Sequence, residues 1–341
     1  MIKQCEHHSL RGLNTMGIDV VADRYVSFDE PDVDLPALWT QGCFQGNFVV
    51  LGHGANVVFT ADFHGTVVHP ANAYIIIDDT DPVAEVKVGA GMLWDDVVAI
   101  TVSHNLSGLE NLSGIPADAG GAVVQNIGAY GAEISSLITS VRAFDTLSGE
   151  FVVFTADECG FAYRTSRFKL RDNKFIITDI TLALQKVADP WEANTSYAGL
   201  RQRYESSPED FANPEGVRHV VTDIRNSKLP DPDSVPNAGS FFKNPVVDKS
   251  VADSILAKYP DMPSWKVDAP DKVKLSGGWL IEKSLWKGRR LGPVGIDPRS
   301  ALVVINPDGG SASDILRLVE AVTADVFSNF GIKLEPEVLY I

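Results

Sequence analysis

The spacing of hydrophobic and polar residues divides the chain into a strand-rich first part and a more helical second part. Short apolar or alternating stretches bounded by glycine and polar turns predict strands at residues 48–51, 57–59, 140–145, 150–155 and 174–186. The strands at 140–145 and 150–155 form a hairpin around Thr146-Leu147-Ser148-Gly149. Apolar residues on a single face predict one helix in this part, at residues 93–104.

The pattern changes near residue 190. Residues 187–235 are polar and contain several prolines, which predicts an ordered connector. Beyond the connector the chain predicts helices at 250–259 and 278–286 and a buried strand at 301–305. The strongest helical signal begins at Ser313 as N-cap, carries an apolar stripe as far as Phe330 and ends at Gly331.

Composition and charge narrow the function classes. The 341 residues are enough for about two domains, and 45% hydrophobic with 22% charged residues is ordinary for a globular protein. The net charge of −16 argues against a nucleic-acid partner, because an acidic surface repels the phosphate backbone. The apolar runs are too short to cross a membrane. The N-terminus lacks a secretory signal, and three distant cysteines give no disulfide framework and no metal spacing, so we expect a cytoplasmic protein.

Three glycine-rich loops lie in the strand-rich part, at residues 51–56, 88–91 and 114–122. Glycine allows the backbone to approach a ligand closely, and successive amide N–H groups then form a concave site for a diphosphate. Each loop alone could equally be a tight turn, since none has the spacing of the classical dinucleotide fingerprint. The run Gln125–Gly131 combines small residues with amide and phenol groups and would suit a flat, polar-edged ring such as isoalloxazine.

The sequence also resembles a known family. The resemblance runs from residue 14 to the last residue, and several motifs carry it: Gly108-Leu109-Glu110-Asn111-Leu112, Gln125 to Gly131, Tyr163-Arg164, residues 228–232, residues 237–245, residues 278–282 and Leu334-Glu335-Pro336-Glu337-Val338. Together they are similar to the UDP-N-acetylenolpyruvoylglucosamine reductase (MurB) family. The segment around Tyr197 resembles the subtype with a tyrosine-containing substrate loop. Ala117 and Leu339 depart from the family pattern.

The resemblance implies an α+β fold with a two-part FAD-binding region of the PCMH/vanillyl-alcohol-oxidase type and a small α/β substrate-binding domain. The boundaries it implies are 1–65 with 331–341, then 66–228, then 229–330. We expect FAD to be bound noncovalently and NADPH to be the co-substrate.

The implied reaction reduces the enolpyruvyl ether of UDP-N-acetylglucosamine enolpyruvate to UDP-N-acetylmuramate, a step in peptidoglycan precursor synthesis. We expect a monomer with a small-molecule substrate and neither membrane nor nucleic-acid partner. Two alternatives remain at this stage: an FAD-dependent sugar or alcohol oxidase of the same fold group, and a non-catalytic nucleotide-binding module.

The residues expected to bind the cofactor come from the glycine loops and from the run that follows them. They are Gly52, His53, Gly54, Ala55, Asn56, Gly114, Ile115, Pro116, Gly120, Gly121, Gln125, Asn126, Gly128, Ala129, Tyr130 and Gly131.

Three residues are expected to be catalytic. Arg164 offers a planar fork suited to a carboxylate or enediolate, although a surface arginine on a turn would look the same in sequence. The family motif favours Glu337 as the acidic group that stabilises the enolic intermediate, but Glu335 would share its face on a strand. Ser240, preceded by Gly239, is the expected proton donor.

Substrate binding is expected from a separate set, namely Tyr163, Tyr197, Lys228, Asn244 and Lys274. Arg225 is a further candidate for a phosphate contact, although it could equally be a solvated surface charge.

Overall fold

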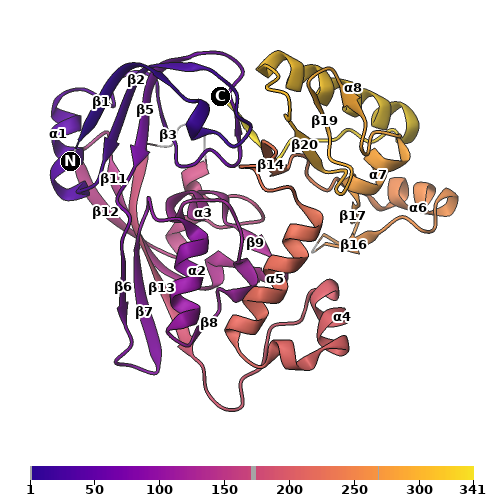
Figure 1. Cartoon of the computed structure of the whole chain (residues 1–341), viewed down its shortest axis with the longest axis horizontal. Coiled ribbons are helices and arrows are strands. Elements are labelled where there is room, and N and C mark those ends of the chain that lie inside the picture. Colours follow the sequence, from indigo (N-terminus) through magenta and orange to yellow (C-terminus); the bar gives the residue numbers. More distant parts are fainter. Residues whose placement is uncertain (1, 170–173, 268) are drawn as a thin grey trace. The chain divides into compact units, whose positions relative to one another are not determined.

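A computed structural model describes residues 2–169, 174–267 and 269–341 (Figure 1). The chain divides into two compact units. Unit 1 comprises the described parts of residues 1–8, 22–53 and 64–225, and unit 2 comprises those of 9–21, 54–63 and 226–341. The three-domain division implied by the resemblance remains a prediction.

A six-stranded antiparallel sheet is the framework of unit 1, in the order β12-β11-β13-β7-β6 with β8 beside β13. Its strands are β6 (Ile75–Asp78), β7 (Val83–Gly89), β8 (Leu106–Ser107), β11 (Ile138–Asp145), β12 (Glu150–Thr155) and β13 (Phe175–Lys186). Val141 pairs with Phe154 on one side and Ile180 on the other, which confirms the predicted hairpin and the strand after it.

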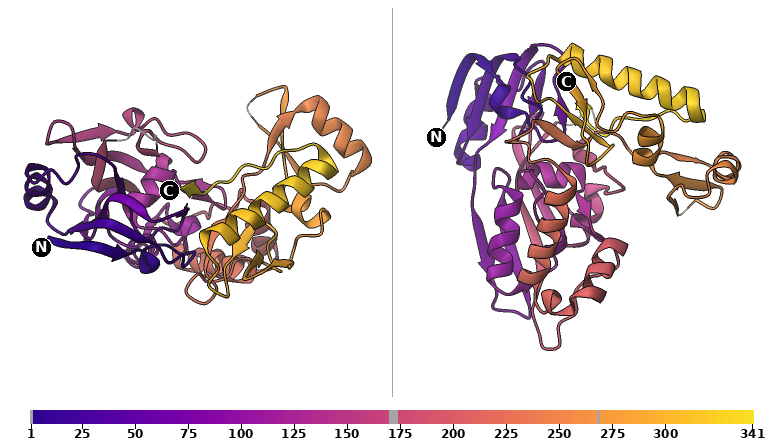
Figure 2. Two further views of the ribbon diagram at one scale, coloured as in Figure 1. Left: turned by 90° about the horizontal axis from the view of Figure 1, so that it is seen from above. Right: turned by 45° about the vertical axis from the view of Figure 1, so that its right-hand side comes forward.

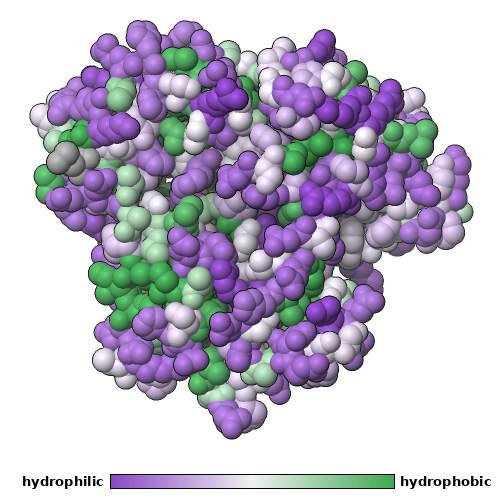
Figure 3. Space-filling view, viewed as in Figure 1, coloured by the Kyte–Doolittle hydropathy of each residue, from purple (hydrophilic) through white to green (hydrophobic). Residues whose placement is uncertain are grey.

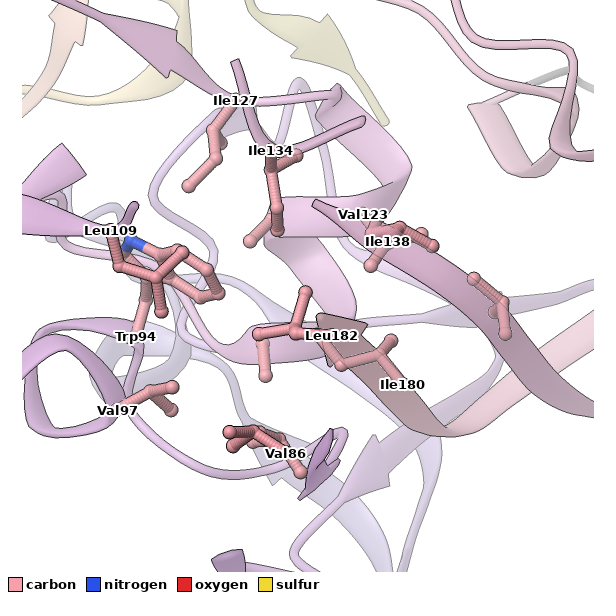
Figure 4. Close-up of a cluster of buried hydrophobic side chains, with 14 of the residues drawn as sticks. Val86, Trp94, Val97, Leu109, Val123, Ile127, Ile134, Ile138, Ile180 and Leu182 are labelled. Atoms are coloured by element: carbon pink, nitrogen blue, oxygen red, sulfur yellow. The ribbon is translucent and has the colours of Figure 1, made fainter. Parts of the chain in front are cut away.

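Helices α2 (Trp94–Ser103) and α3 (Ala119–Gln125) pack against this sheet. Figure 4 shows the core between them, where Trp94 and Val97 of α2 and Val123 of α3 lie near Ile180 and Leu182 of β13. These side chains are fully or almost fully buried because the apolar residues of each strand alternate toward the helices. The helix predicted at 93–104 is confirmed, whereas α3 was missed because its sequence, Ala-Gly-Gly-Ala-Val-Val-Gln, resembles a loop.

A second sheet in unit 1 has the order β1-β2-β5-β3. It contains β1 (Lys3–Ser9), β2 (Val21–Phe28), β3 (Phe48–Val50) and β5 (Phe63–Pro70). Helix α1 (Pro31–Thr40) packs against it through Leu35 and Leu38, both fully buried. The periodicity did not predict α1, because it begins at Pro31 and contains Pro36.

The segment predicted as a connector is instead largely helical, which corrects the prediction. It contains α4 (Ala198–Ser206), a 3-10 turn at Pro208–Phe211 and α5 (Pro214–Lys228). Val217, Val220 and Val221 of α5 form an apolar stripe at helical spacing that packs with Leu200 of α4. The many charged residues around this stripe lowered its apparent hydrophobicity and concealed it.

Unit 2 contains a four-stranded sheet, a three-stranded sheet and a pair of short strands, each with its own position in the chain. One sheet has the order β14-β20-β19-β18, from β14 (Asn237–Ser240), β18 (Arg290–Leu291), β19 (Val294–Ile296) and β20 (Val303–Ile305). It is joined by α7 (Gly277–Lys283) and α8 (Ala312–Phe330), and α8 is seen along its length in Figure 2. The other piece contains α6 (Lys249–Lys258) and a sheet of order β15-β17-β16, from β15 (Val246–Asp248), β16 (Ser264–Lys266) and β17 (Lys272–Leu275).

The C-terminal helix begins earlier than predicted. Ser311, not Ser313, is its N-cap, and it forms a capping box with Asp314. The helix ends at Gly331 in the left-handed conformation, as expected. After it, β21 (Leu339–Tyr340) pairs in parallel with β4 (Val57–Val58).

Other short pieces of regular structure complete the described chain. They are β9 (Gly128–Ala129), β10 (Ala132–Glu133) and 3-10 turns at Arg11–Leu13, Glu110–Leu112, Ile134–Ser136, Asp157–Cys159 and Arg167–Lys169. Among the described residues, no helix combines the length and apolar character that crossing a bilayer requires. Figure 3 shows hydrophobic residues exposed over β6 and β7, where Ile76 and Val83 are 59% and 40% accessible.

Candidate functional site: glycine loops, an arginine turn and a serine bulge

The first glycine loop is built around close backbone approaches. In unit 1, Asp118 accepts hydrogen bonds from His53 N (2.8 Å) and contacts His53 Nδ1 (2.5 Å). A Cβ at Gly52 would overlap the Asp118 carboxylate. In unit 2, Gly54 has φ +62°, and a Cβ there would overlap the carbonyl oxygen of Leu13. The available space therefore requires glycine at both positions, and the positive φ favours glycine at Gly54 as well.

Thr15 lies beside this loop in unit 2 and was not singled out in the sequence. Its amide donates to the carbonyl oxygen of Gly54 (3.4 Å). Its Oγ1 is buried and has no hydrogen-bond partner among the described residues. A buried hydroxyl without a partner is costly, and a ligand at this loop could satisfy it.

The second loop has a different role. A Cβ at Gly89 would overlap the carbonyl oxygen of Asn72, and one at Gly91 would lie 2.5 Å from that of Pro70. These glycines allow the chain to pack against itself, so the loop is explained by packing alone.

The third loop is held in place by hydrogen bonds at both backbone groups of Gly114, its N–H and its carbonyl oxygen. Gly114 N donates to Asp95 Oδ1 (2.5 Å), and Gly114 O accepts from Arg225 Nε (3.0 Å). Gly114 has φ +70°, and a Cβ there would lie 3.2 Å from the Arg225 side chain. Asp95 also binds Arg218 in a bidentate pair at 2.6 and 2.8 Å, and these contacts keep its pKa below the usual value despite burial.

Ile115 and Pro116 continue this loop to α3. At the start of α3, Gly120 packs against Ala90, whereas a Cβ at Gly121 would meet no atom within 4 Å. The helix start therefore has open space above Gly121. Arg225, a candidate for a phosphate contact, is occupied by Gly114 and by a hydrogen bond to the Tyr130 phenol, and burial lowers its pKa.

The run Gln125–Gly131 leads from the end of α3 into a tight hairpin. Gly128 and Ala129 pair with Glu133 and Ala132, so that Tyr130 and Gly131 form a two-residue turn. Both have positive φ, +50° and +85°, which is the pattern of a type I′ turn. Before the hairpin, Asn126 is fully buried, and its side chain contacts Glu133 and the carbonyl oxygen of Ala162.

Arg164 is held against this hairpin by a second tight turn. Ala162 and Thr165 exchange two backbone hydrogen bonds, and Arg164 between them has φ +55°. Its Nη2 donates to the carbonyl oxygen of Gly128 (2.7 Å). Lys169 Nζ bonds both Gln125 Oε1 (2.6 Å) and the carbonyl oxygen of Arg164 (2.8 Å). A left-handed arginine is unusual, and such strain is concentrated at functional sites.

Two tyrosines lie close together in unit 1. The rings of Tyr130 and Tyr197 meet edge to face, with centroids 5.2 Å apart. Burial raises the pKa of Tyr130. Tyr197 is 42% exposed and immediately precedes α4. Tyr163 is more exposed and lies 5.5 Å from the Arg164 guanidinium, measured to the ring centroid.

In unit 2, Ser240 ends strand β14 at an irregularity in the pairing with β20. Gly239 has φ +64°, and its N–H donates to Asn237 Oδ1 (2.9 Å). Asn237 in turn donates to the carbonyl oxygens of Pro230 and Val235. This bulge leaves Ser240 exposed at the end of a buried strand.

Residues 335–337 run beside the residues that follow Ser240. Glu337 N donates to the carbonyl oxygen of Phe241 (2.7 Å), and Lys243 N donates to that of Glu335 (2.9 Å). The Glu337 amide is thus bonded to the residue next to Ser240. The Glu335 side chain is 71% exposed and lies 3.9 Å from Lys243 Nζ. The structure therefore places the Glu337 backbone beside Phe241, the residue after Ser240, and the Glu335 backbone beside Lys243.

The other expected substrate residues are also in unit 2. Asn244 Oδ1 accepts from Gly277 N at the start of α7 (2.9 Å). Lys274 lies on β17 opposite Val246, and its Nζ is 5.7 Å from the Trp265 ring centroid. Lys228 ends α5 and is exposed. Trp265, 45% exposed, was missed because a single tryptophan carries no periodic signal.

The remaining expected cofactor residues, Ala55 and Asn56, follow Gly54 in unit 2. Asn56 Nδ2 donates to the carbonyl oxygen of Glu337 (3.4 Å), and Leu339 N donates to that of Asn56 (2.9 Å). The first glycine loop and the Glu337 segment are therefore neighbours within unit 2.

A pocket of about 370 Å³ adjoins the Tyr130–Gly131 turn in unit 1. Its lining is Gly108, Glu110, Asn111, Gly131, Ala132, Glu133, Ser136, Leu137 and Asn194. Glu110 and Asn111 are almost completely buried. Burial raises the pKa of Glu110, although its carboxylate accepts a hydrogen bond from Gly108 N (2.6 Å).

Comparison with known proteins defines the class. A model of the FAD-binding domain matches residues 40–155, and a model of the UDP-N-acetylenolpyruvoylglucosamine reductase C-terminal domain matches residues 231–341. The chain is therefore an FAD-dependent oxidoreductase with the α+β fold that the sequence predicted.

Relatives along the whole chain identify the family. The UDP-N-acetylenolpyruvoylglucosamine reductase of Alcanivorax borkumensis is 41% identical over 336 residues, covering 98% of this chain and 95% of the relative. That of Bacteroides fragilis is 38% identical over 338 residues, covering 98% and 99%. The chain belongs to the UDP-N-acetylenolpyruvoylglucosamine reductase family. The crystal structure of the Thermus caldophilus enzyme shares its fold, with a TM-score of 0.67, 24% identity and coverage of 100% and 98%.

Proposed function

We propose that this chain reduces the enolpyruvyl ether of UDP-N-acetylglucosamine enolpyruvate to UDP-N-acetylmuramate, with Ser240, Arg164 and Glu337 as its catalytic residues. The observation that carries the proposal is the pairing of residues 335–337 with residues 241–243, which holds the Glu337 backbone against Phe241, the residue after Ser240. A proton donor and an acidic group at one place fit a reaction that forms and then protonates an enolate.

The chain's residues fit FAD. Gly121 leaves space at the start of α3, Gly54 permits close backbone approach, and Thr15 has a buried hydroxyl that lacks a partner among the described residues. We assign the first and third glycine loops to the diphosphate, and residues 125–131, which lead into the β9–β10 hairpin, to the ring system. Bound FAD supplies the hydride chemistry, taking hydride from NADPH and passing it to the substrate. Asn126 is fully buried, so it acts by fixing the hairpin.

Arg164 is assigned to the substrate carboxylate. Hydride addition at the β-carbon leaves negative charge on the α-carbon and its carboxylate, which a guanidinium fork can stabilise. The strained turn and the hydrogen bond to Gly128 hold Arg164 in place before substrate binds, so little reorganisation is needed. Glu337 is assigned to the enolic intermediate, in preference to the more exposed Glu335.

Ser240 is assigned the protonation of the α-carbon. A serine hydroxyl is a weak acid, but an enolate needs only a well-aligned donor with access to water. The Gly239 bulge directs Ser240 out of the strand, and its exposure gives that access.

We assign the remaining substrate contacts to Lys228, Lys274, Asn244, Tyr163 and Tyr197. Lys274 beside Trp265 combines a cation with an exposed aromatic face, which suits a phosphate next to a nucleobase. Tyr197 belongs to the tyrosine-loop subtype and would cover the substrate. We further propose that the enzyme works as a monomer in the cytoplasm, where nucleotide sugars are made.

The test follows the flavin absorbance anaerobically. NADPH should bleach the flavin, and addition of the enolpyruvyl UDP sugar should restore the oxidised spectrum with formation of UDP-N-acetylmuramate. A purified chain without flavin would favour a non-catalytic module. A flavin that NADPH does not bleach but a sugar or alcohol does would favour an oxidase.

A further inference from the structure

Asn111 occupies a buried position that none of the catalytic or binding assignments above uses. It follows Glu110 in the 3-10 turn Glu110–Leu112, and only 1% of it is accessible to solvent. Its Nδ2 donates to two carbonyl oxygens, those of Tyr130 (2.8 Å) and Asn194 (2.9 Å). One side chain therefore joins the Tyr130–Gly131 turn to the segment that leads to Tyr197.

Three further contacts join the same two segments. Asn194 Nδ2 donates back to the carbonyl oxygen of Gly131 (3.1 Å). Ser196 bonds Asn194 Oδ1 through its N–H and its hydroxyl, and it packs so closely against Gly131 that a Cβ there would overlap Ser196 Oγ. The Tyr130 and Tyr197 rings then meet edge to face. Asn111 is the buried member of this group, and it contacts both segments without belonging to either.

The orientation of the Asn111 side chain is set entirely by its donors. Both Nδ2 hydrogens are used, whereas Oδ1 is buried without a partner among the described residues. A buried, unpaired amide oxygen is destabilising, so an asparagine here costs stability that an apolar residue of the same size would not. The compensating benefit is the pair of bonds to Tyr130 and Asn194. Such a local conflict with stability is expected where a residue serves function.

We propose that Asn111 is a positioning residue for substrate binding, which holds the Tyr197 segment against the Tyr130 turn so that Tyr197 meets the substrate in a fixed position. This inference rests on the proposed assignment of Tyr197 to the substrate. The group formed by Asn111, Tyr130, Gly131, Asn194, Ser196 and Tyr197 is called the Asn111 bridge. It acts on the substrate through Tyr197. The Tyr130 turn, which is assigned to FAD, is closed by its own strand pair β9–β10, so loss of Asn111 should leave FAD binding and hydride transfer from NADPH in place.

Asn111→Leu and Asn111→Asp test the bridge, and Asn72 supplies a matched control. Asn72 is also buried in unit 1, its Nδ2 donates to the carbonyl oxygen of Thr178 (2.6 Å), and its Oδ1 likewise has no partner among the described residues. Asn72→Leu and Asn72→Asp therefore make the same chemical changes at a site outside the bridge.

We expect Asn111→Leu to weaken binding of the enolpyruvyl UDP sugar about tenfold, measured by perturbation of the oxidised flavin spectrum and as KM, because it removes two hydrogen bonds. FAD affinity and the rate of flavin reduction by NADPH should stay within about twofold of the parent, and Asn72→Leu should leave substrate affinity unchanged. A merely structural role would move FAD affinity, reduction and substrate affinity together, or move them equally in the two leucine variants. Either result would overturn the proposal.

The aspartate variant adds a pH readout. In Asn111→Asp, an ionised carboxylate would face two carbonyl oxygens, whereas a protonated carboxyl would donate to one of them. Substrate affinity in Asn111→Asp should therefore recover as the pH falls. The leucine variant and Asn72→Asp should show no such recovery beyond that of the parent. Equal pH profiles in all three would contradict the bridge.

Tyr197→Ala distinguishes a failure of the Asn111 bridge from a failure of the assignment of Tyr197 to the substrate. If it lowers substrate affinity while Asn111→Leu does not, the Tyr197 assignment stands and the bridge is wrong. If Tyr197→Ala leaves substrate affinity intact, the assignment of Tyr197 is wrong and the proposal falls with it.

Discussion

The two regions that carry the proposed catalytic residues are built on different principles. The Arg164 region (residues 111, 125–135, 162–169 and 194–197) fixes its side chains by many hydrogen bonds among themselves and with the backbone. The Ser240 region (residues 237–244 and 335–338) is fixed mainly by backbone pairing, with the amides of Asn237 and Asn244 bonded to nearby backbone groups. Its Ser240 and Glu335 side chains are exposed.

This difference matches what each region is asked to do. A group that stabilises charge is most effective when it is already oriented, because reorganisation during the reaction is avoided. A serine that delivers a proton must exchange it with water afterwards, so exposure is useful and rigid side-chain packing is not. Mutations in the two regions should therefore have different signatures.

The largest effect is expected for Ser240→Ala. It deletes one exposed hydroxyl, so folding, FAD binding and reduction by NADPH should be nearly intact. Flavin reoxidation by the enolpyruvyl substrate should slow by about 10²- to 10⁴-fold, the usual contribution of a positioned proton donor. Stopped-flow absorbance of the oxidised flavin band measures both half-reactions.

Ser240→Cys is the control for this variant. It keeps a group that can donate a proton and should retain more activity than alanine. If Ser240→Ala reoxidises as fast as the parent, Ser240 is not the donor.

Arg164→Lys should have the next largest effect, about 10²-fold on reoxidation, with much less effect on reduction. Lysine keeps the charge but loses the planar fork and the geometry of the bond to Gly128. The variant is followed in the same two half-reactions. Equal slowing of both would mean that Arg164 serves structure or binds both ligands.

How far the sequence predicted these regions depends on the kind of signal that each carries. Period-2 alternation and the Thr-Leu-Ser-Gly turn predicted β11, β12 and β13 because each is a local pattern. Helices α1, α3 and α5 were missed because proline, glycine or charge masks their apolar faces, and only tertiary packing reveals them.

The site shows the same division. Motifs identified Ser240 and Glu337 as candidate catalytic residues. The pairing of their two segments joins residues about 100 positions apart, which no local pattern encodes. Asn111 stands in a motif that carries the family resemblance, but no role could be assigned to it from the sequence. Its importance lies in bonds to Tyr130 and Asn194, and an asparagine in a loop is ordinarily a turn residue.

Alanine at two glycines compares the packing of the regions directly. Gly131→Ala introduces a left-handed alanine and a clash with Ser196, so we expect a loss of about 1–3 kcal/mol in the free energy of unfolding. Gly239→Ala introduces the strained conformation but meets no atom within 4 Å, and should cost about 1–2 kcal/mol. Denaturant unfolding of holoenzyme measures both. A larger loss for Gly239→Ala would contradict the expectation that the Arg164 region is packed more tightly at its glycine than the Ser240 region.

The smallest expected effect is on the pH dependence of stability, through Glu110. This residue precedes Asn111 in the chain. Burial raises the pKa of Glu110, so the folded chain binds this proton more tightly than the unfolded chain does. The free energy of unfolding therefore falls as pH rises from the ordinary glutamate pKa, about 4.3, through the raised value. Glu110→Gln removes this loss, and its stability relative to the parent should increase with pH across that window.

Glu158→Gln is the opposite case. Hydrogen bonds from the Thr155 amide and hydroxyl lower the pKa of Glu158, so its contribution is present above the ordinary glutamate pKa and is lost as pH falls. The stability of Glu158→Gln relative to the parent should therefore decrease slightly with rising pH. Thermal unfolding of both variants and the parent from about pH 2 to 8 covers both windows and gives the two slopes. Slopes of the same sign would show that burial does not control the pKa of Glu110. In that case the surroundings of Glu110 and Asn111 would be more open to water than their packing indicates.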